Sequence, residues 1–244
     1  MKKILIIKTG NIADEIASLY GDKEDYFIKG TGLPGESFII INIFKNEDLP
    51  DFDTISGIII TGAAAYITEH HEWSEKTARR LPEAVDKNIP LLGVCYGHQL
   101  LAYSLGGEVD FNDKGREIGT IPVELTAKAK KDPLFQIFSK RKIYFQASHS
   151  QSVIRLPIEA EIIAANNHDP HHAFRISGKN VWGIQFHPEF NAGIIRSIID
   201  DRRERICEEG LNPEELSATC KDFSYGTMLL KRFVEIIMSG NIVK

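Results

Sequence analysis

Short apolar runs alternate with segments of helical spacing in the first part of the chain. Continuous runs rich in Ile, Leu and Val have the length of buried strands and cover Ile4–Ile7, Phe38–Ile43, Gly57–Ile60 and Pro90–Val94. Apolar residues recur with helical spacing in Asn11–Tyr20, Trp73–Asn88 and Gly97–Leu105. This alternation predicts an α/β fold with an open, mostly parallel sheet flanked by helices.

The pattern changes after the pair Gly106-Gly107. Closely spaced strand-like segments follow, and they cover Ile118–Leu125, Lys142–Ala147, Ile162–Ala165, His172–Ile176 and Val181–Phe186. We expect them to extend or flank the sheet as antiparallel hairpins. The last part, Ala192–Val243, is predicted to be helical, and Asn212 with Pro213 marks one helix start. Since no repeat or linker interrupts the sequence, we expect a single domain over residues 1–244, with about 192–244 as a helical C-terminal extension.

Composition and charge exclude several classes of protein. Hydrophobic residues make up 43% and charged residues 26% of the 244 residues, as in an ordinary globular protein. The net charge of −5 offers no basic surplus for nucleic acid. No apolar run has transmembrane length, and the apolar N-terminal run is too short for a signal peptide. The three cysteines lack disulfide or zinc spacing. We therefore expect a cytoplasmic protein without nucleic-acid or membrane partners, and a homo-oligomer is possible.

Three other patterns invite a functional interpretation that their context does not support. The segment Gly30–Gly35 matches G-x-G-x-x-G, but Pro34 lies inside it and a strand follows, so we expect a mobile loop rather than a nucleotide site. The histidines in His70-His71 and His168–His172 lack metal-ligand spacing, and we predict polar loop residues near the cleft, with no metal and no cofactor. The charged run Arg202–Arg205 is predicted to be a solvated helix face.

A small-residue turn around Cys95 carries the first chemical signal. The segment Gly93-Val-Cys95-Tyr-Gly97 follows a buried strand and leads into a helix, as in a nucleophile elbow with Cys in place of Ser. A helix N-terminus behind the sulfur lowers the pKa of a thiol, and the N–H of Tyr96 is placed to stabilise an oxyanion. Alone, this motif is equally compatible with a buried, inert cysteine.

A second motif follows much later in the chain, in the segment Phe186-His187-Pro188-Glu189. A strand delivers His187 at its end, and Glu189 can accept a hydrogen bond from the imidazole and fix its tautomer. A cysteine, a distant histidine and an acidic partner form a nucleophile–base–orienter set.

Together the two motifs resemble those of the class I, or triad-type, glutamine amidotransferase family. The family carries G-x-C-x-G-x-Q followed by H-P-E, and this chain has Gly93-x-Cys95-x-Gly97-x-Gln99 followed by His187-Pro-Glu189. The resemblance extends over roughly three-quarters of the chain, to about residue 190. It implies a flavodoxin-like sheet and hydrolysis of the γ-carboxamide of glutamine through a cysteine thioester.

The resemblance also implies roles for residues outside the triad. The second oxyanion donor comes from a glycine-rich turn, here Gly62-Ala63, where the family usually has two glycines. The N–H of Ala63 is therefore expected to assist that of Tyr96. Gly62 of the same turn is expected to contact substrate, and Gln99 matches a family glutamine that helps hold it. Ser148-His149-Ser150 resembles the segment that contacts the amino-acid end of the substrate, through backbone groups.

Three functions remain open at this level. The chain could be a stand-alone hydrolase of glutamine or of a γ-glutamyl amide or peptide, like the stand-alone relatives of the GMP synthase amidotransferase domain. It could instead be a glutaminase subunit that delivers ammonia to a separate synthetase partner. A non-catalytic binding relative is the third alternative, although such a protein does not need all of Cys95, His187 and Glu189.

Overall fold

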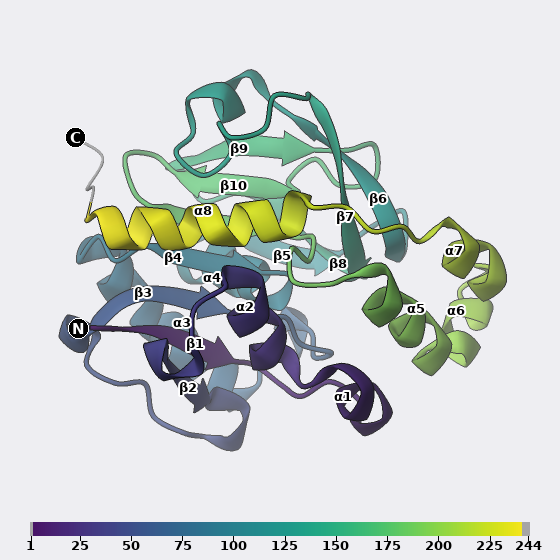
Figure 1. Ribbon diagram of the computed structural model, residues 1–244, viewed down its shortest axis with the longest axis horizontal. Coiled ribbons are helices and arrows are strands. Elements are labelled where there is room, and N and C mark those ends of the chain that lie inside the picture. Colours follow the sequence, from purple (N-terminus) through teal and green to yellow (C-terminus); the bar gives the residue numbers. More distant parts are fainter. Residues whose placement is uncertain (1, 241–244) are drawn as a thin grey trace.

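A nine-stranded mixed sheet forms the centre of the molecule (Figure 1). The structure, a computed structural model, describes residues 2–240. One half of the sheet is parallel and contains, in spatial order, β2 (Phe38–Asn42), β1 (Lys3–Lys8), β3 (Ile55–Ile60), β4 (Leu91–Val94) and β11 (Val181–Ile184). The antiparallel half continues through β10 (Ala173–Ile176), β9 (Ala160–Ala165), β6 (Glu117–Leu125) and β7 (Lys142–His149). The predicted α/β class and its helix-flanked sheet are confirmed.

Helices cover both faces of the sheet. One face packs against α2 (Lys23–Thr31) and α8 (Tyr225–Ser239), and the other against α3 (Glu72–Asp86) and α4 (Tyr96–Ser104). The remaining helices gather beyond one end of the sheet (Figure 1), and they are α1 (Asp14–Tyr20), α5 (Ala192–Asp201), α6 (Arg203–Glu208) and α7 (Pro213–Thr219). Short 3₁₀ turns lie at Gly35–Ser37, Ile43–Lys45, Phe52–Thr54, Ile67–Glu69 and Ala127–Lys131.

Burial on both faces explains the continuous apolar runs of the parallel strands. Successive side chains of a strand point to opposite faces. In β1, Ile4 and Ile6 join the cluster that contains α2 and α8 residues, whereas Leu5 and Ile7 join the cluster beside α3 and α4. The sequence of a strand that is covered on both faces is therefore continuously apolar and does not alternate between polar and apolar residues.

Some elements differ from the sequence-based expectations. The expected loop at Gly30–Gly35 is partly wrong, because its first two residues end α2 and Gly32 caps this helix at φ 75°. The pattern of α2 is weak, and Asp22 starts the helix with a capping box completed by Asp25. The strands β5 (Glu108–Phe111) and β8 (Gln151–Arg155) form a separate two-stranded ribbon that the sequence did not predict.

The C-terminal region is helical as predicted. The side chain of Asn212 accepts hydrogen bonds from the N–H groups of Glu214 and Glu215, which confirms the predicted start of α7. Residues 241–243 of the expected helical segment lie outside the described residues. Among the helices of residues 2–240, none is long and apolar enough to cross a membrane.

Candidate active site

A strained turn between β4 and α4 presents Cys95. Its backbone has φ 52° and ψ −103°, a conformation that residues other than glycine rarely adopt. The turn is tight because its glycines touch their neighbours. A Cβ on Gly93 would lie 2.4 Å from the carbonyl oxygen of Gly97, and a Cβ on Gly97 would lie 2.4 Å from that of Ile60. The G-x-C-x-G spacing is therefore required by packing between the strand ends and the start of the helix.

His187 follows β11 at the same edge of the sheet. Its backbone N–H donates to the carbonyl of Gln146 at 2.8 Å, and its ring stacks on Phe190 with centroids 4.0 Å apart. The Nδ1–H donates to Oε1 of Glu189 at 2.7 Å, because a carboxylate can only accept. This bond leaves Nε2 of His187 as the atom available for proton transfer.

The charges of Cys95 and His187 are coupled. Burial alone would raise the pKa of the Cys95 thiol, but the charge and hydrogen bond of His187 lower it below its ordinary value. Burial alone would lower the pKa of His187, but the charges of Glu189 and Cys95 raise it to about 9. The pair is therefore stabilised as a thiolate and an imidazolium at neutral pH.

The turn after β3 lies directly beside these two residues. A Cβ on Gly62 would approach Cε1 of His187 to 2.9 Å and Cβ of Cys95 to 3.3 Å, so this position needs glycine. The carbonyl of Gly62 accepts hydrogen bonds from Oγ1 of Thr9 at 2.8 Å and from Nζ of Lys23 at 2.9 Å. These bonds fix the turn, and Ala63 next to it lines the cavities on both sides of Cys95. Its role as oxyanion donor, like that of Tyr96, stays a prediction.

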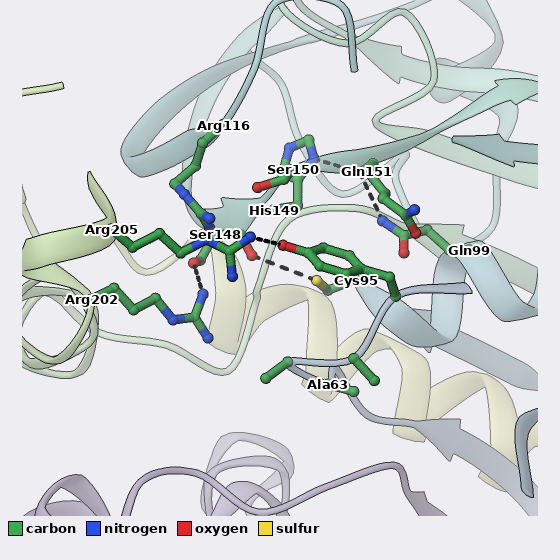
Figure 2. A pocket seen from close by; sticks show the side chains of 13 residues that line it. Ala63, Cys95, Gln99, Arg116, Ser148, His149, Ser150, Gln151, Arg202 and Arg205 are labelled. Atoms are coloured by element: carbon green, nitrogen blue, oxygen red, sulfur yellow. Dashed lines mark hydrogen bonds between the residues drawn. The ribbon is translucent and has the colours of Figure 1, made fainter. Parts of the chain in front are cut away.

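The residues expected to hold substrate surround the thiol (Figure 2). The backbone carbonyl of Ser148 lies 3.9 Å from Sγ of Cys95. Ser150 has a buried hydroxyl without a hydrogen-bond partner among residues 2–240, and it lines a cavity that Cys95 and Ser148 also line. The Nε2 of Gln99 is already bonded to the carbonyl of Gln151 at 2.8 Å and to Oε1 of Gln185 at 2.9 Å. Only the Oε1 of Gln99 therefore remains for a substrate.

Two cavities meet at Cys95. The first has a volume of about 80 Å³ and continues past His149 toward Arg116 and Arg205. The second, of about 230 Å³, continues past His187 toward Lys23. Cys95, Ser148 and Arg202 line both, so a bound molecule can lie across the thiol and reach either side.

Two cations beside Cys95, the buried Lys23 and the partly buried Arg202, were not predicted from the sequence. The expectation of a solvated face at Arg202–Arg205 is wrong for Arg202, which lies between α5 and α6, lines both cavities and donates to Oγ of Ser148 at 2.8 Å. Lys23 lies in the first turn of α2 and is 7% exposed. Neither cation has an ion pair with a carboxylate in the described part of the chain. Burial lowers the pKa of Lys23 to about 8.

The other expected loop histidines have different surroundings. His70 contacts Glu75 at 2.9 Å and His71 contacts Glu69 at 3.0 Å, on the exposed surface as expected. His172 is fully buried, contrary to the expectation of a polar loop residue. His149 is buried too, and its ring nitrogens contact Glu117 and the carbonyl of Gln151, so contact with a substrate is left to its backbone.

The fold and the site together define an α/β protein with a buried cysteine–histidine–glutamate set at the carboxyl edge of a parallel sheet. The family model of glutamine amidotransferase class-I matches residues 38–201. This match covers more than half of the chain, and the chain belongs to the class I glutamine amidotransferase family.

The share of a relative's length that this chain matches differs from one relative to the next. It is 26% identical over 196 residues to a glutamine amidotransferase-like protein of Schizosaccharomyces pombe, covering 78% of this chain and 75% of that one. Gamma-glutamyl peptidase 5 of Arabidopsis thaliana is 27% identical over 189 residues, 76% of this chain and 74% of that one. GMP synthase of Porphyromonas gingivalis is 33% identical over 148 residues, which are 60% of this chain but only 28% of the synthase.

Solved structures show the same fold over nearly the whole chain. A glutamine amidotransferase of Thermotoga maritima superposes with a TM-score of 0.76, covering 97% of this chain and 98% of that one at 22% identity. One from Methylobacillus flagellatus gives a TM-score of 0.70, covering 96% and 95% at 18% identity. The helices after residue 201, which lie beyond the family model, are therefore shared with these structures in fold.

Proposed function

We propose that this chain is a cysteine-dependent amidohydrolase that cleaves the γ-carboxamide of glutamine, or of a γ-glutamyl amide or peptide, as a stand-alone enzyme. One observation carries the proposal: the strained Cys95 lies beside a His187 whose Nδ1–H donates to Glu189 at 2.7 Å. An inert structural cysteine would need neither a strained backbone nor a paired imidazole.

In the first half of the proposed reaction, the Cys95 thiolate attacks the amide carbon and forms a C–S bond. The negative charge moves to the carbonyl oxygen, where the N–H groups of Tyr96 and Ala63 stabilise it. His187 donates its proton to the leaving nitrogen, the C–N bond breaks, and ammonia or the amine departs. A γ-glutamyl thioester remains on Cys95.

In the second half, His187 is neutral and accepts a proton from a water molecule that attacks the thioester carbon. The same N–H groups stabilise the oxyanion, and the C–S bond breaks to release glutamate and the Cys95 thiolate. His187 is again an imidazolium held by Glu189, so the cycle needs no metal or organic cofactor to balance its protons.

The cations Lys23, which is buried, and Arg202, which is partly buried, support an anionic substrate. A desolvated charge without a carboxylate partner is costly unless a ligand supplies the opposite charge. Both side chains line the cavity beside Cys95 and His187. The α-carboxylate of a γ-glutamyl group, or a carboxylate on the leaving peptide, would complete an ion pair there.

The likeness to Gamma-glutamyl peptidase 5 over most of both chains favours the stand-alone hydrolase. The match to GMP synthase, confined to 28% of that protein, keeps the ammonia-delivering subunit as the second candidate. A non-catalytic binding protein is the least supported interpretation, because it would not need the Cys95–His187–Glu189 set.

The test is a panel of substrates given to the purified protein. We expect glutamate release from glutamine or from one of several γ-glutamyl amides and peptides, measured together with ammonia or the free amine. Cys95→Ala should lose this activity while remaining folded, and Cys207→Ala, at an exposed cysteine, serves as the matched control. Equal hydrolysis by Cys95→Ala would refute the nucleophile.

A covalent label separates the remaining alternatives. A glutamine-like diazo-ketone should attach to Cys95 in the wild type and not in Cys95→Ala, as read by peptide mass. Labelling without turnover of any substrate would favour a subunit that needs a synthetase partner. Absence of both labelling and turnover would favour a binding protein.

A further inference from the structure

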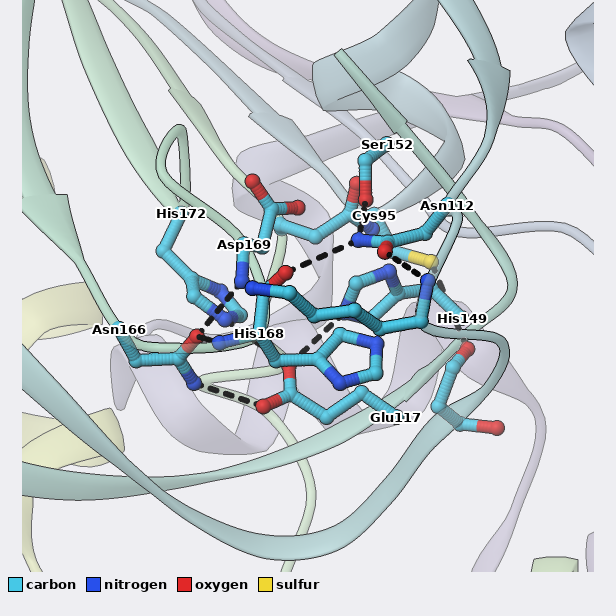
Figure 3. A network of polar contacts seen from close by, with 12 residues as sticks. Cys95, Asn112, Glu117, His149, Ser152, Asn166, His168, Asp169 and His172 are labelled. Atoms are coloured by element: carbon cyan, nitrogen blue, oxygen red, sulfur yellow. Dashed lines mark hydrogen bonds and ion pairs between the residues drawn. The ribbon is translucent and has the colours of Figure 1, made fainter. Parts of the chain in front are cut away.

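Three buried side chains from separate parts of the chain converge behind the wall of the active site (Figure 3). They are Glu117 on β6, His149 on β7 and His172 just before β10. One ligand atom of each lies within 4.8 Å of the other two. The Oε2 of Glu117 is 3.0 Å from Nε2 of His149 and 2.9 Å from Nε2 of His172.

Outer hydrogen bonds hold two of these side chains in the orientation that a metal ligand needs. The Nδ1–H of His149 donates to the carbonyl of Gln151 at 2.9 Å, which leaves a lone pair on Nε2. The Oε1 of Glu117 accepts from the side-chain amide of Asn166 at 2.6 Å, which leaves Oε2 free. Metal-binding histidines and carboxylates are commonly oriented by such second contacts.

The geometry of His172 is the independent indication of a ligand. This side chain is fully buried, yet neither ring nitrogen has an aligned hydrogen-bond partner among the described residues. Its Nε2 lies at ion-pair distance from Oε2 of Glu117, 2.9 Å, but is not aligned for a hydrogen bond to it. Lone pairs that converge on a shared ion point between the ligands rather than at one another. A buried nitrogen without an aligned hydrogen bond is costly, so an occupant that it can bind is favoured.

We propose that Glu117, His149 and His172 bind one divalent transition-metal ion, with Zn²⁺ as the best fit. Two imidazoles and a carboxylate suit Zn²⁺ and disfavour Mg²⁺ or Ca²⁺, which prefer oxygen. Ligands around tetrahedral zinc lie roughly 3.3 Å apart for bond lengths of about 2.0–2.1 Å, so the two contacts of Glu117, at 3.0 and 2.9 Å, need to lengthen by only a few tenths of an ångström. Beyond the three side chains, a four-coordinate zinc ion needs one further ligand. An octahedral iron ion would need three further ligands, for which a buried site has less room.

The site would stabilise the wall that faces Cys95. His149 follows Ser148, whose carbonyl is 3.9 Å from the thiol. An ion at this point would join the segment before β10 to β6 and β7, which already pair with each other through backbone hydrogen bonds. The expectation of no metal site came from local spacing, which does not include Glu117 or His149.

A proton on Nε2 of His149 competes with the metal ion for the space between the three side chains. Both neighbours of His149, the carbonyl of Gln151 and the carboxylate of Glu117, are acceptors, so without a metal both ring nitrogens would carry hydrogen. Imidazole nitrogen resonances in the metal-free protein report this state directly. If Zn²⁺ never displaces that proton, the cluster is a buried ion pair and the proposal fails.

The experiment titrates Zn²⁺ into the 244-residue chain after removal of metal with a chelator. Cys95→Ala is used as background, so that the active-site thiol cannot bind the ion. We expect one equivalent to bind in competition with a chromophoric chelator and to raise the Tm. Co²⁺ in the wild type should give the absorption of a four-coordinate ion without a sulfur-to-cobalt band; that band would assign the ion to Cys95 instead.

Matched variants locate the site. His172→Gln should weaken Zn²⁺ binding at least about tenfold, whereas His168→Gln, in the same loop but bonded to the carbonyl of Gly115, should not. Glu117→Gln provides a second ligand variant if His172→Gln folds poorly by circular dichroism. Equal affinity in the ligand variants and in His168→Gln, or no binding in the Cys95→Ala background, would overturn the proposal.

Discussion

At the scale of single residues, the proposed chemistry depends on the charge state shared by Cys95 and His187. Each group is buried, and each stabilises the ionised form of the other. Glu189 adds a fixed negative charge behind the imidazole, 2.7 Å from its Nδ1. The reactive form therefore exists between the lowered pKa of the thiol and the raised pKa of the imidazole.

This arrangement predicts a bell-shaped dependence of kcat/KM on pH. Activity rises as Cys95 loses its proton, below the ordinary thiol pKa, and falls as His187 loses its proton near pH 9. Glu189→Gln removes a charge that holds the proton on His187, so the alkaline limb should move to lower pH. The check is the pH profile of both proteins, with the rate of iodoacetamide alkylation reporting the thiolate. An unchanged alkaline limb in Glu189→Gln would contradict the coupling.

Lys23 should weaken the fold while serving the site. Burial lowers its pKa to about 8, so folding a charged Lys23 is unfavourable at neutral pH. We expect Lys23→Met to raise the free energy of unfolding by about 1 kcal/mol or more, and the Tm by about 2–4 °C, while KM for an anionic substrate rises. The carbonyl of Gly62 keeps its bond from Thr9 in this variant.

The pH dependence of the stability difference shows whether Lys23→Met stabilises the fold by removing a buried charge or by packing better. The unfolded chain binds more protons at Lys23 than the folded one between pH about 8 and the ordinary value of 10.5, so wild-type stability from this group rises with pH across that window. The advantage of Lys23→Met should therefore shrink above pH 8, as measured by urea unfolding. The exposed Lys140→Met is the control, and a pH-independent advantage would argue for packing alone.

At the scale of elements, the site exists because three strand ends are brought into contact. The turn after β3, the turn after β4 and the end of β11 supply Gly62, Cys95 and His187. Parallel neighbours end at the same edge of a sheet, so the thiol and the imidazole meet without any direct sequence link. Their separation is fixed by backbone contact rather than by flexible side chains.

Gly97→Ala tests that backbone contact. The new Cβ would lie 2.4 Å from the carbonyl oxygen of Ile60, so α4 has to move away from β3. We expect a loss of about 1–3 kcal/mol in the free energy of unfolding and a fall in kcat. Gly35→Ala is the control, because its Cβ would meet no atom within 4 Å, and its stability should change by less than about 0.5 kcal/mol. Equal stability of the two variants would show that the turn adapts freely.

At the scale of the whole molecule, the last helix belongs to the same core as the sheet. Leu229, Leu230 and Phe233 of α8 are fully buried in the cluster that contains Ile4 and Ile6. The start of α8 also touches the turn that follows His187, since a Cβ on Gly226 would lie 2.0 Å from the carbonyl oxygen of Pro188. The C-terminal helices therefore support the position of His187 from behind.

Phe233→Ala measures the contribution of α8 to this core. Removing a fully buried phenyl ring should cost about 3–5 kcal/mol, through lost burial and the cavity that remains. Met238→Ala, on the same helix but 67% exposed, should change stability by less than about 0.5 kcal/mol. Chemical unfolding of both variants provides the comparison, and a small effect of Phe233→Ala would mean that α8 is only loosely attached.

The sequence determined those parts of the fold that depend only on residues close together in the chain. Buried strands such as β1 and β4 appear as continuous apolar runs, and Asn212 caps α7 through its own neighbours. The motifs around Cys95 and His187 encode a turn and a strand end, so the residue pattern alone was enough to assign them. The ribbon of β5 and β8 could not be predicted in this way, because its short strands pair across about 40 residues of chain.

Only the tertiary structure decided which distant charges face the site. Lys23, Arg202 and the cluster of Glu117, His149 and His172 carry no local pattern that separates them from surface residues. Their positions result from how α2, α5 and the antiparallel strands pack against the sheet. Sequence therefore determined the strands and the chemical motif around Cys95. Packing between segments far apart in the chain decided which charges surround it, because desolvation and pairing exist only once those segments meet.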